Sequence, residues 1–322
     1  MARYLVTGGA GFIGSHLAER LLKDGHSVTV IDNCATGRLA NVAHLRGHSK
    51  FNLCVESVRN EMVLDRLVCD CDVIFHLAAS VGVKLIVEKP IDVIETNVLG
   101  TTMVLNLARR YLKSVYIAST SEIYGKSEQV PFNEDSDRLL GSTTKSRWCY
   151  SSSKAIDEFL ALAYFKEHNL KIVIGRFFNT IGPRQTGQYG MVAPRFVQAA
   201  LAGRPVEVYG DGNQSRCFLD VDDAVEAIVR LMDHPKSGGQ VFNVGSSREI
   251  SINDLAKKII ELAGSKSALV RIPYEQAYEP GFEDMRRRVP DVSKLKKWVN
   301  FEPRYTLEDT LGKIIAYYHI HP

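Results

Sequence analysis

A glycine-rich turn near the start of the chain, between a short apolar run and an amphipathic segment, limits the fold more than any other feature. Residues 4–7 (YLVT) form a candidate strand, residues 7–14 read TGGAGFIG, and HLAERLL follows with helical spacing. Glycines at 8, 11 and 14 allow a tight turn and a close approach of the backbone to a pyrophosphate. The order strand, turn, helix therefore predicts a dinucleotide site at the N-terminus of a helix.

Short runs rich in β-branched and apolar residues continue along the first half of the chain, with helical patterns between most of them. Such alternation is typical of βαβ units, in which helices cover both faces of a parallel sheet. We therefore expect an α/β fold with a Rossmann-type doubly wound parallel sheet. The candidate strands are residues 4–7, 28–32, 73–77, 115–119 and 172–178.

After residue 178, turns that contain glycine and proline separate shorter elements. This pattern predicts a smaller, interleaved C-terminal substrate-binding domain. Residues 241–244 (VFNV) read as a strand that returns to the first sheet. A helix over about 252–263 is expected, because Ser251 can cap its start and Gly264 can end it. The expected division is residues 1–178 with about 211–247 for nucleotide binding, and residues 179–210 with 248–322 for the substrate.

The composition argues against several other classes of protein. The net charge of +3, with both signs interspersed, does not favour a nucleic-acid surface, and the only basic cluster is RRR at 286–288. The six cysteines lack both the paired spacing of a zinc site and the density of a disulfide framework, so we expect reduced thiols and no metal. No basic-then-apolar leader opens the chain, and no apolar stretch approaches the roughly 20 residues of a membrane span. We expect a cytoplasmic protein.

An acidic residue follows the second expected strand at the distance typical of a ribose contact. Asp32 lies 18 residues after Gly14, where its carboxylate can accept hydrogen bonds from adenosine ribose hydroxyls. A 2′-phosphate there would meet a like charge, so NAD is favoured over NADP. Arg38, on the following loop, is the alternative partner for such a phosphate, although a solvated loop charge is the simpler interpretation.

Two further patterns can carry chemistry. Tyr150 and Lys154 share a helix face, so the ammonium can stabilise a phenolate and lower the pKa of the tyrosine toward the range of a general base. Residues 120–122 (Thr-Ser-Glu) place two hydroxyls and a carboxylate after the strand at 115–119. Purely structural roles remain as alternatives: these three residues can hydrogen-bond backbone groups at the end of the strand, and Tyr150 can be a packing residue. His76 and Cys149 are interpreted as buried structural residues.

Six motifs, in order and at their intervals, resemble the extended short-chain dehydrogenase/reductases that modify nucleotide sugars. They are TGGAGFIG (7–14), HLAA (76–79), STSEIYG (119–125), YSSSK (150–154), RFFNTIGPR (176–184) and VYGDGNQSRCF (208–218). The resemblance implies an NAD site formed by Gly8, Gly11, Phe12, Ile13, Gly14, Asp32, Asn33, Val58, Leu77, Ala78, Ala79, Asn97, Tyr150, Lys154 and Phe177. It implies contacts with a UDP-sugar from Lys84, Asn179, Val192, Tyr209, Arg216 and Arg288.

Within that family, residues 32–48, 118–125 and 286–291 are most similar to UDP-glucuronate decarboxylases, which form UDP-xylose or its 4-keto precursor. By this resemblance, Thr120 holds the sugar O4 beside Tyr150, and Lys154 binds the nicotinamide ribose and tunes the tyrosine. Arg288 reaches the sugar end of the site. The implied catalytic set is Thr120, Ser121, Glu122, Tyr150, Lys154 and Arg288.

Related reactions remain as alternatives. The 4-epimerases usually have small or neutral residues at positions 121 and 122, dTDP-glucose dehydratases have Asp-Glu, and GDP-mannose dehydratases share Ser-Glu. Residues 80–90 (SVGVKLIVEKP) resemble an epimerase, and Glu56-Ser57 replaces the Gly-Asp that usually meets the adenine. We expect a decarboxylase, with a UDP-sugar 4-epimerase and then a 4,6-dehydratase as alternatives. A non-enzymatic NAD-binding protein is disfavoured, because Thr120, Tyr150 and Lys154 are all present.

The resemblance also implies a homodimer, formed through a four-helix contact of the segments near 97–111 and 148–168. From the residues alone, these segments carry apolar side chains on more than one face, Tyr164 and Phe165 among them.

Overall fold

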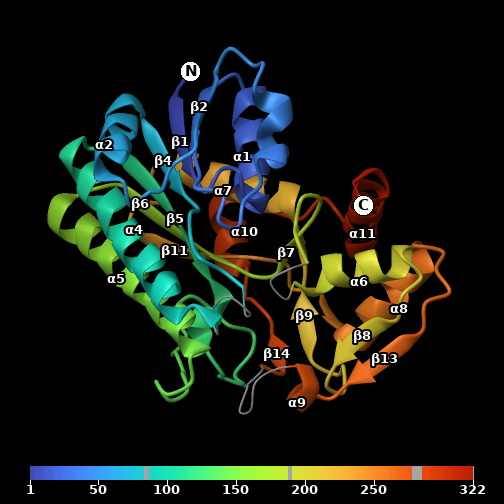
Figure 1. Cartoon of the computed structure of the whole chain (residues 1–322). Coiled ribbons are helices and arrows are strands. Elements are labelled where there is room, and N and C mark those ends of the chain that lie inside the picture. The colour runs from blue at the N-terminus through green and yellow to red at the C-terminus, as the bar shows by residue number, and fades with distance from the viewer. Residues whose placement is uncertain (83–85, 87, 188–190, 278–284, 322) are drawn as a thin grey trace.

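A seven-stranded sheet lies at the centre of the computed structural model, which describes residues 1–82, 86, 88–187, 191–277 and 285–321 (Figure 1). Neighbouring strands in this sheet are all parallel. Their order is β11-β6-β5-β4-β1-β2-β3, so the direction of winding reverses between β1 and β4. The strands are β1 (Arg3–Thr7), β2 (Ser27–Ile31), β3 (Phe51–Cys54), β4 (Val73–His76), β5 (Ser114–Thr120), β6 (Ile172–Phe177) and β11 (Gln240–Val244).

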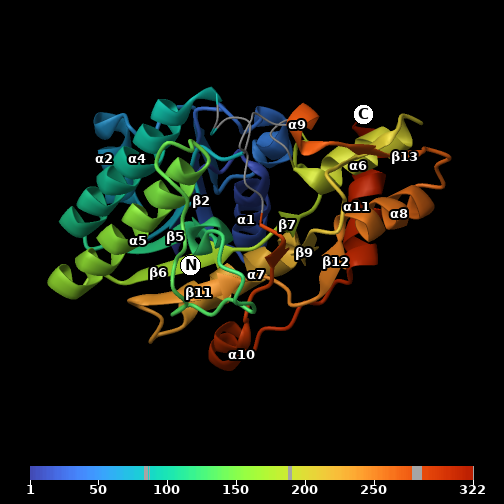
Figure 2. The ribbon, with the colours of Figure 1, turned by 90° about the horizontal axis from the view of Figure 1, so that it is seen from below.

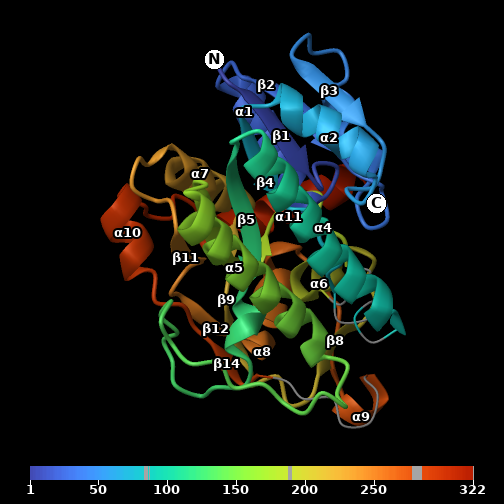
Figure 3. The same cartoon turned by 90° about the vertical axis from the view of Figure 1, so that its left-hand side faces the viewer.

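Helices cover both faces of the sheet, because each parallel strand needs a crossover connection to the next. Successive side chains of β1 therefore enter different cores: Val6 packs with α1 and α7, and Leu5 packs with α2 and α4. One layer consists of α1 (Phe12–Lys23), α7 (Val221–Asp233) and α10 (Ser293–Val299). The other consists of α2 (Glu61–Asp70), α4 (Pro90–Arg110) and α5 (Trp148–His168), of which α4 and α5 run side by side (Figure 3).

The remaining elements form a smaller unit at the side of the sheet opposite α4 and α5 (Figure 2). Its core joins α6 (Val192–Leu201), α8 (Ile252–Leu262) and α11 (Leu307–Ile320) to β8 (Val206–Tyr209) and β13 (Leu269–Ile272). No helix in the described ranges is long and apolar enough to cross a bilayer. The short elements are η1 (Leu39–Leu45), η2 (Ser121–Tyr124), β7 (Thr180–Ile181), β9 (Ser215–Cys217), β10 (Leu219–Asp220), β12 (Glu249–Ser251), α9 (Tyr274–Ala277) and β14 (Arg287–Arg288).

The expected α/β class and the five expected strands are confirmed, and β11 returns to the large sheet as predicted. The expected helix at 252–263 is α8, with Ser251 accepting a hydrogen bond from the Asp254 amide and Gly264 in the left-handed region at φ +57°. Strand β3 was not expected, because FNLC is short and only partly buried at the sheet edge. Within the range 211–247, α7 and β11 lie with the large sheet, whereas β9 pairs with β12 and β14.

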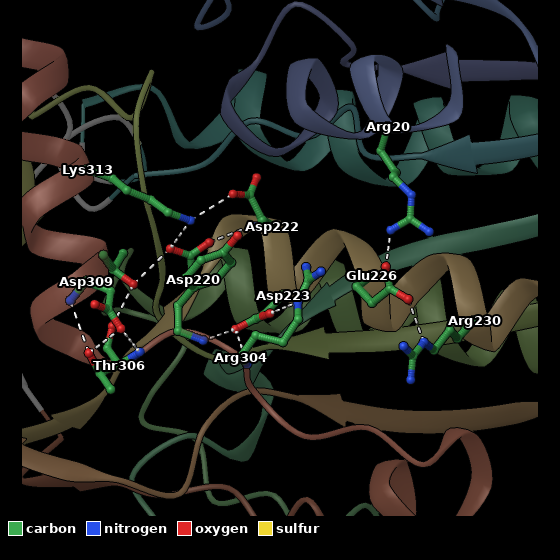
Figure 4. Close-up of polar contacts among 12 residues, drawn as sticks. Arg20, Asp220, Asp222, Asp223, Glu226, Arg230, Arg304, Thr306, Asp309 and Lys313 are labelled. Atoms are coloured by element: carbon green, nitrogen blue, oxygen red, sulfur yellow. Dashed lines mark hydrogen bonds and ion pairs between the residues drawn. The ribbon is translucent and has the colours of Figure 1, made fainter. Parts of the chain in front are cut away.

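The start of α7 connects the two units through charged side chains (Figure 4). The fully buried Asp220 carboxylate accepts hydrogen bonds from the Thr310 hydroxyl at 2.8 Å and from Lys313 Nζ at 3.1 Å, both on α11. Asp222 contacts the same ammonium at 2.8 Å, and its other oxygen lies 3.3 Å from His16 Nδ1 on α1. The acidic residues also suit the positive end of the helix dipole. A single lysine therefore joins α11 to a helix of the large sheet.

Replacing Lys313 by Met should lower the free energy of unfolding by roughly 2 kcal/mol, because the buried Asp220 would lose its cation while the apolar stem is kept. Urea unfolding measures this loss. Lys257→Met is the matched control: its pair with Asp254 is 70% and 61% exposed, so the expected change is below about 0.5 kcal/mol. Equal losses in the two variants would contradict the connecting role of Lys313.

Candidate active site

A cleft of about 800 Å³ opens along the carboxyl ends of the central strands and extends to α6, β8 and β9 of the smaller unit. In open α/β sheets, ligands bind outside these strand ends where the strand order reverses, which is here between β1 and β4. Most of the predicted site residues line it: Gly8, Gly11, Phe12, Ile13, Gly14, Asp32, Asn33, Val58, Leu77, Ala78, Ala79, Thr120, Ser121, Glu122, Tyr150, Phe177, Asn179, Val192, Tyr209, Arg216 and Arg288. Asn97 and Lys154 are not among its lining residues. Lys84 lies outside the described residues.

In the glycine-rich turn, backbone segments lie too close together to leave room for side chains. Gly8 has φ +70°, and a Cβ there would lie 2.8 Å from the Ala78 amide nitrogen after β4. A Cβ on Gly14 would lie 2.3 Å from the Gly8 carbonyl oxygen. A side chain at Gly8 would push the turn away from the segment after β4, and one at Gly14 would push α1 away from the turn. The first turn of α1 therefore stands directly at the floor of the cleft, where its free amides and positive dipole end favour an anion.

Asp32 ties the end of β2 to that turn. Its carboxylate accepts hydrogen bonds from the amides of Ala10 at 2.9 Å and Cys34 at 2.8 Å. Burial raises the pKa of Asp32, although these amide hydrogen bonds oppose the shift. Carboxylate oxygens have further lone pairs, so Asp32 can still accept from a ligand hydroxyl. Arg38 also lines the cleft, with its Nη2 3.5 Å from the Thr186 hydroxyl.

The predicted catalytic hydroxyls lie together on the cleft wall. Thr120 caps η2, since its Oγ1 accepts from the Glu122 amide at 3.2 Å, and its side chain lies close to Tyr150. Burial and then the negative charge of Glu122 raise the pKa of Tyr150, and the nearby Thr120 side chain only partly opposes them. Our expectation of a lowered pKa for Tyr150 is therefore wrong for this arrangement.

The ion pair of Lys154 explains in part why the pKa of Tyr150 is not lowered. Its ammonium is buried and donates to Asp157 Oδ2 at 2.7 Å, so its charge is balanced by a carboxylate of the same helix. Asn97, on α4, is also buried: it accepts from the Ser80 amide at 2.8 Å and donates to Ser153 Oγ at 3.1 Å. Both residues support the wall of the cleft from behind in this arrangement.

Two arginines converge on the carboxylate of Glu122. Arg288 Nη2 lies 2.7 Å from Oε1, and Arg147 Nη2 lies 3.5 Å from Oε2. Burial alone would raise the pKa of Glu122, but the charges of Arg288 and Arg147 outweigh it, so the pKa is lowered. Arg288 Nη1 also reaches the Ser121 hydroxyl at 3.5 Å. Glu122 is therefore an ionised carboxylate at neutral pH, with two guanidinium groups beside it.

The far end of the cleft is formed by the smaller unit. Arg216 is held by the carbonyl oxygens of Ser215 at 2.8 Å and Met285 at 2.9 Å, and Asn179 donates to the Cys217 carbonyl at 3.2 Å. The Arg195 guanidinium lies 3.8 Å from the centre of the Tyr209 ring. Cationic and amide groups held in this way suit an anionic, planar ligand such as a nucleoside diphosphate.

Sequence reasoning missed Arg147 and Asp157. Both lie at helical spacing from the predicted pair, Arg147 three residues before Tyr150 and Asp157 three residues after Lys154. That spacing is the signal that could have identified them, because residues three and four apart share a helix face. Neither belongs to a motif of the resemblance.

A doubly wound sheet with a glycine-rich turn at its reversal and a Thr-Tyr pair on the cleft wall defines a Rossmann-type enzyme of the dehydrogenase/reductase kind. Residues 5–314 match the model of the family described as GDP-mannose 4,6 dehydratase, and the chain belongs to this family.

Individual relatives cover nearly the whole chain. A UDP-N-acetyl-alpha-D-glucosaminuronate decarboxylase of Bacillus cytotoxicus is 46% identical over 98% of this chain and 97% of its own. UDP-glucuronic acid decarboxylase 1 of Danio rerio is 38% identical over 98% of this chain and 72% of its own. The crystal structure of a UDP-glucuronic acid 4-epimerase from Bacillus cereus, in complex with UDP-glucuronic acid and NAD, is similar with a TM-score of 0.89. It shares 28% identity, with 99% of this chain and 100% of that chain covered.

The buried His76, behind the cleft on β4, should make stability depend on pH. Burial, and to a lesser degree the charge of Lys154, lowers the pKa of His76 from 6.5 to about 3. The unfolded chain takes up a proton below pH 6.5 and the native protein does not, so stability is lost as the pH falls from 6.5 toward 3. This group should contribute a loss on the order of 3 kcal/mol at about pH 4.

His76→Gln removes the titrating group, so its unfolding free energy should vary less over the same pH range. Denaturant unfolding of both proteins at several pH values gives the difference. Parallel pH profiles for the two proteins would contradict a neutral His76.

Proposed function

We propose that this protein is an NAD-dependent UDP-uronate decarboxylase that acts on UDP-glucuronate and forms UDP-xylose or its 4-keto precursor. The observation that carries the proposal is the cluster of Glu122 with Arg147 and Arg288 beside Tyr150. Guanidinium groups bind carboxylates with paired, charge-assisted hydrogen bonds, so Arg147 and Arg288 suit a sugar that carries its own carboxylate. A neutral hexose has no such group. The decarboxylase names of the relatives support the same conclusion.

The cofactor is NAD. The turn at Gly8 and Gly14 leaves room for a pyrophosphate, and Asp32 offers a carboxylate to a ribose and repels a 2′-phosphate. When bound, NAD supplies the acceptor for a hydride from the sugar C4 and returns it at the end of the cycle. The proposed division of labour assigns the large sheet, with α7 and β11, to the cofactor, and the smaller unit to the nucleotide sugar.

The residues of the chain then handle protons and charge. Tyr150 takes the proton of the C4 hydroxyl as C4 is oxidised, which gives a ketone at the β position to the C6 carboxylate. The C5–C6 bond can break because its electrons enter an enolate, whose oxygen Thr120 and Tyr150 can hydrogen-bond. One such donor is typically worth about 3 kcal/mol. CO2 leaves, C5 takes up one proton, and reduction at C4 takes its proton from Tyr150.

Glu122 has a defined role in this series of reaction steps. As an ionised group it cannot protonate C5 itself, so it orients a water that does so. It also keeps Arg147 and Arg288 in place at the sugar end of the cleft. Lys154 lies one helical turn from Tyr150, and its ammonium, paired with Asp157 in this arrangement, is the cation assigned to support the phenolate.

A second substrate is favoured by one comparison. The relative that shares 46% of its residues is named for a 2-acetamido uronate, whereas the UDP-glucuronic acid decarboxylase of Danio rerio shares 38%. Both reactions use the same C4 ketone and differ only at C2 of the sugar. Incubation with NAD and each UDP-uronate separately, with measurement of CO2 and the sugar product, decides between them. Formation of the C4 epimer without CO2 from both substrates would overturn the decarboxylase and establish the 4-epimerase.

Glu122→Gln should reduce the kcat of decarboxylation by about 100-fold, because the amide cannot orient a water for C5 as a carboxylate does. The KM for the uronate should not rise, since the glutamine oxygen can still accept from Arg288 while the competing negative charge is lost. Glu128→Gln, an exposed change nearby, is the control and should leave both constants unchanged. CO2 release by Glu122→Gln at the wild-type rate would show that the carboxylate has no part in the reaction.

We also propose a homodimer formed through α4 and α5. These helices run side by side at the surface (Figure 3), and they expose large apolar side chains that a monomer would leave in water. On α4, Ile91 is 70%, Ile94 43% and Leu99 48% exposed. On α5, Ile156 is 46% and Phe159 67% exposed. Pairing with the same face of a second copy would form a four-helix contact with twofold symmetry.

Phe159→Asp should convert the dimer into a monomer, because a charge would enter the centre of the apolar face. Sedimentation should give twice the chain mass of 35.9 kDa for the wild type and once that mass for the variant. Met62→Asp on α2, where the side chain is 85% exposed, is the control and should remain dimeric. A monomeric wild type, or a dimeric Phe159→Asp protein, would exclude this interface.

A further inference from the structure

Behind the cleft wall, Lys154 and Asp157 form an ion pair that is almost completely removed from water. Lys154 Nζ lies 2.7 Å from Asp157 Oδ2, and the two side chains are 3% and 0% exposed. Breaking such a pair from one side is costly, because the remaining charge stays buried. The carboxylate therefore fixes where the ammonium of Lys154 stands, one helical turn from Tyr150.

Polar side chains of other elements surround this pair. His76 Nε2 lies 3.1 Å from Thr101 Oγ1 on α4, and the Thr101 side chain lies near Asp157. His76 Nδ1 lies 2.8 Å from the Thr7 hydroxyl, which accepts from the Ala78 amide at 3.1 Å. The Oδ1 atom of Asp157 is buried and has no hydrogen-bond partner among the described residues, so its charge depends on Lys154.

The carboxylate of Asp157 receives a hydrogen bond from the lysine, which favours its charged form. Burial acts against this by raising the pKa of Asp157. Lys154 alone supplies the balancing cation among the contacts of Asp157 described here.

We propose that Asp157 is a positioning residue of the active site, which holds Lys154 in place and, as its counter-charge, sets the pH at which the Tyr150–Lys154 pair gives up its proton. The inference rests on the proposed function only for the role of Tyr150 as the acid–base group. Asp157 does not line the cleft and acts through Lys154.

The other groups that act on Tyr150 come from the elements around it. Glu122 on η2 raises its pKa, whereas Arg288 on β14 and the nearby Thr120 side chain on β5 lower it. Arg147, the N-cap residue of α5, is paired with Glu122, and His76 on β4 is neutral. None of these changes when Asp157 is replaced. Glu158, the next carboxylate on α5, is already paired with Arg176. Removal of the Asp157 charge therefore leaves Tyr150 to balance Lys154, so the pair should lose its proton at lower pH.

Asp157→Asn, which keeps the size of the side chain, is the first test. The ultraviolet absorbance of tyrosinate is followed against pH without substrate, and the same variant with Tyr150→Phe is subtracted to isolate Tyr150. The midpoint should fall by about 1 pH unit or more. The acidic limb of kcat against pH should move in the same direction. Glu167→Gln removes a charge from the exposed end of the same helix and should move neither.

Thr101→Val provides a second test if Asp157→Asn folds poorly. It leaves the ion pair intact and removes a nearby hydroxyl that favours the charged carboxylate, so the midpoint should fall by a smaller amount. An unchanged tyrosinate midpoint in a folded variant, with only a lower melting temperature, would show that Asp157 is purely structural. That result would leave the proposed reaction intact, because the decarboxylase assay tests it with the wild-type protein.

Discussion

The parallel arrangement of the central strands is the constraint on which the rest of this structure depends. Parallel strands cannot be joined by tight turns, so each crossover places a helix on a face of the sheet and buries it. The carboxyl ends of the strands are then left free at one edge, where they carry loops instead of packing. The glycine turn, Asp32, Thr120 and Asn179 all follow such strand ends, and the reversal between β1 and β4 opens the cleft between them.

Buried charge behind the cleft wall fixes the groups that face it. Glu158 on α5 accepts from the hydroxyl of Ser119, the residue before Thr120, at 2.5 Å. It also accepts from Arg176 Nη2 at 2.8 Å. Arg176 also donates to the Tyr124 hydroxyl at 2.8 Å, at the end of η2. Such pairs cost desolvation, so they are weak evidence for stability. Their consequence here is geometric: β5, β6, α5 and η2 are locked together around Thr120 and Glu122.

Much of the fold and part of the site could be predicted from the sequence. The alternation of apolar runs and helical patterns was sufficient for five strands, because buried parallel strands read as continuous apolar segments. The partly exposed β3 carries no such pattern and was missed. In the site, Thr120 and Tyr150 were predicted and lie together. The pairing of Glu122 with Arg288 could not be predicted, because 166 residues separate them. Helical or strand periodicity gives no information about such distant contacts.

The sequence by itself determined the class of fold and the glycine turn and indicated the candidate acid–base groups, because these depend on local spacing and on side-chain chemistry. Only the tertiary structure decided the charge state of those groups. Burial and neighbours from distant segments raise the pKa of Tyr150, lower that of Glu122 and direct Lys154 toward Asp157. Electrostatic interactions depend on distance and on removal from water, and both are set by packing rather than by position along the chain.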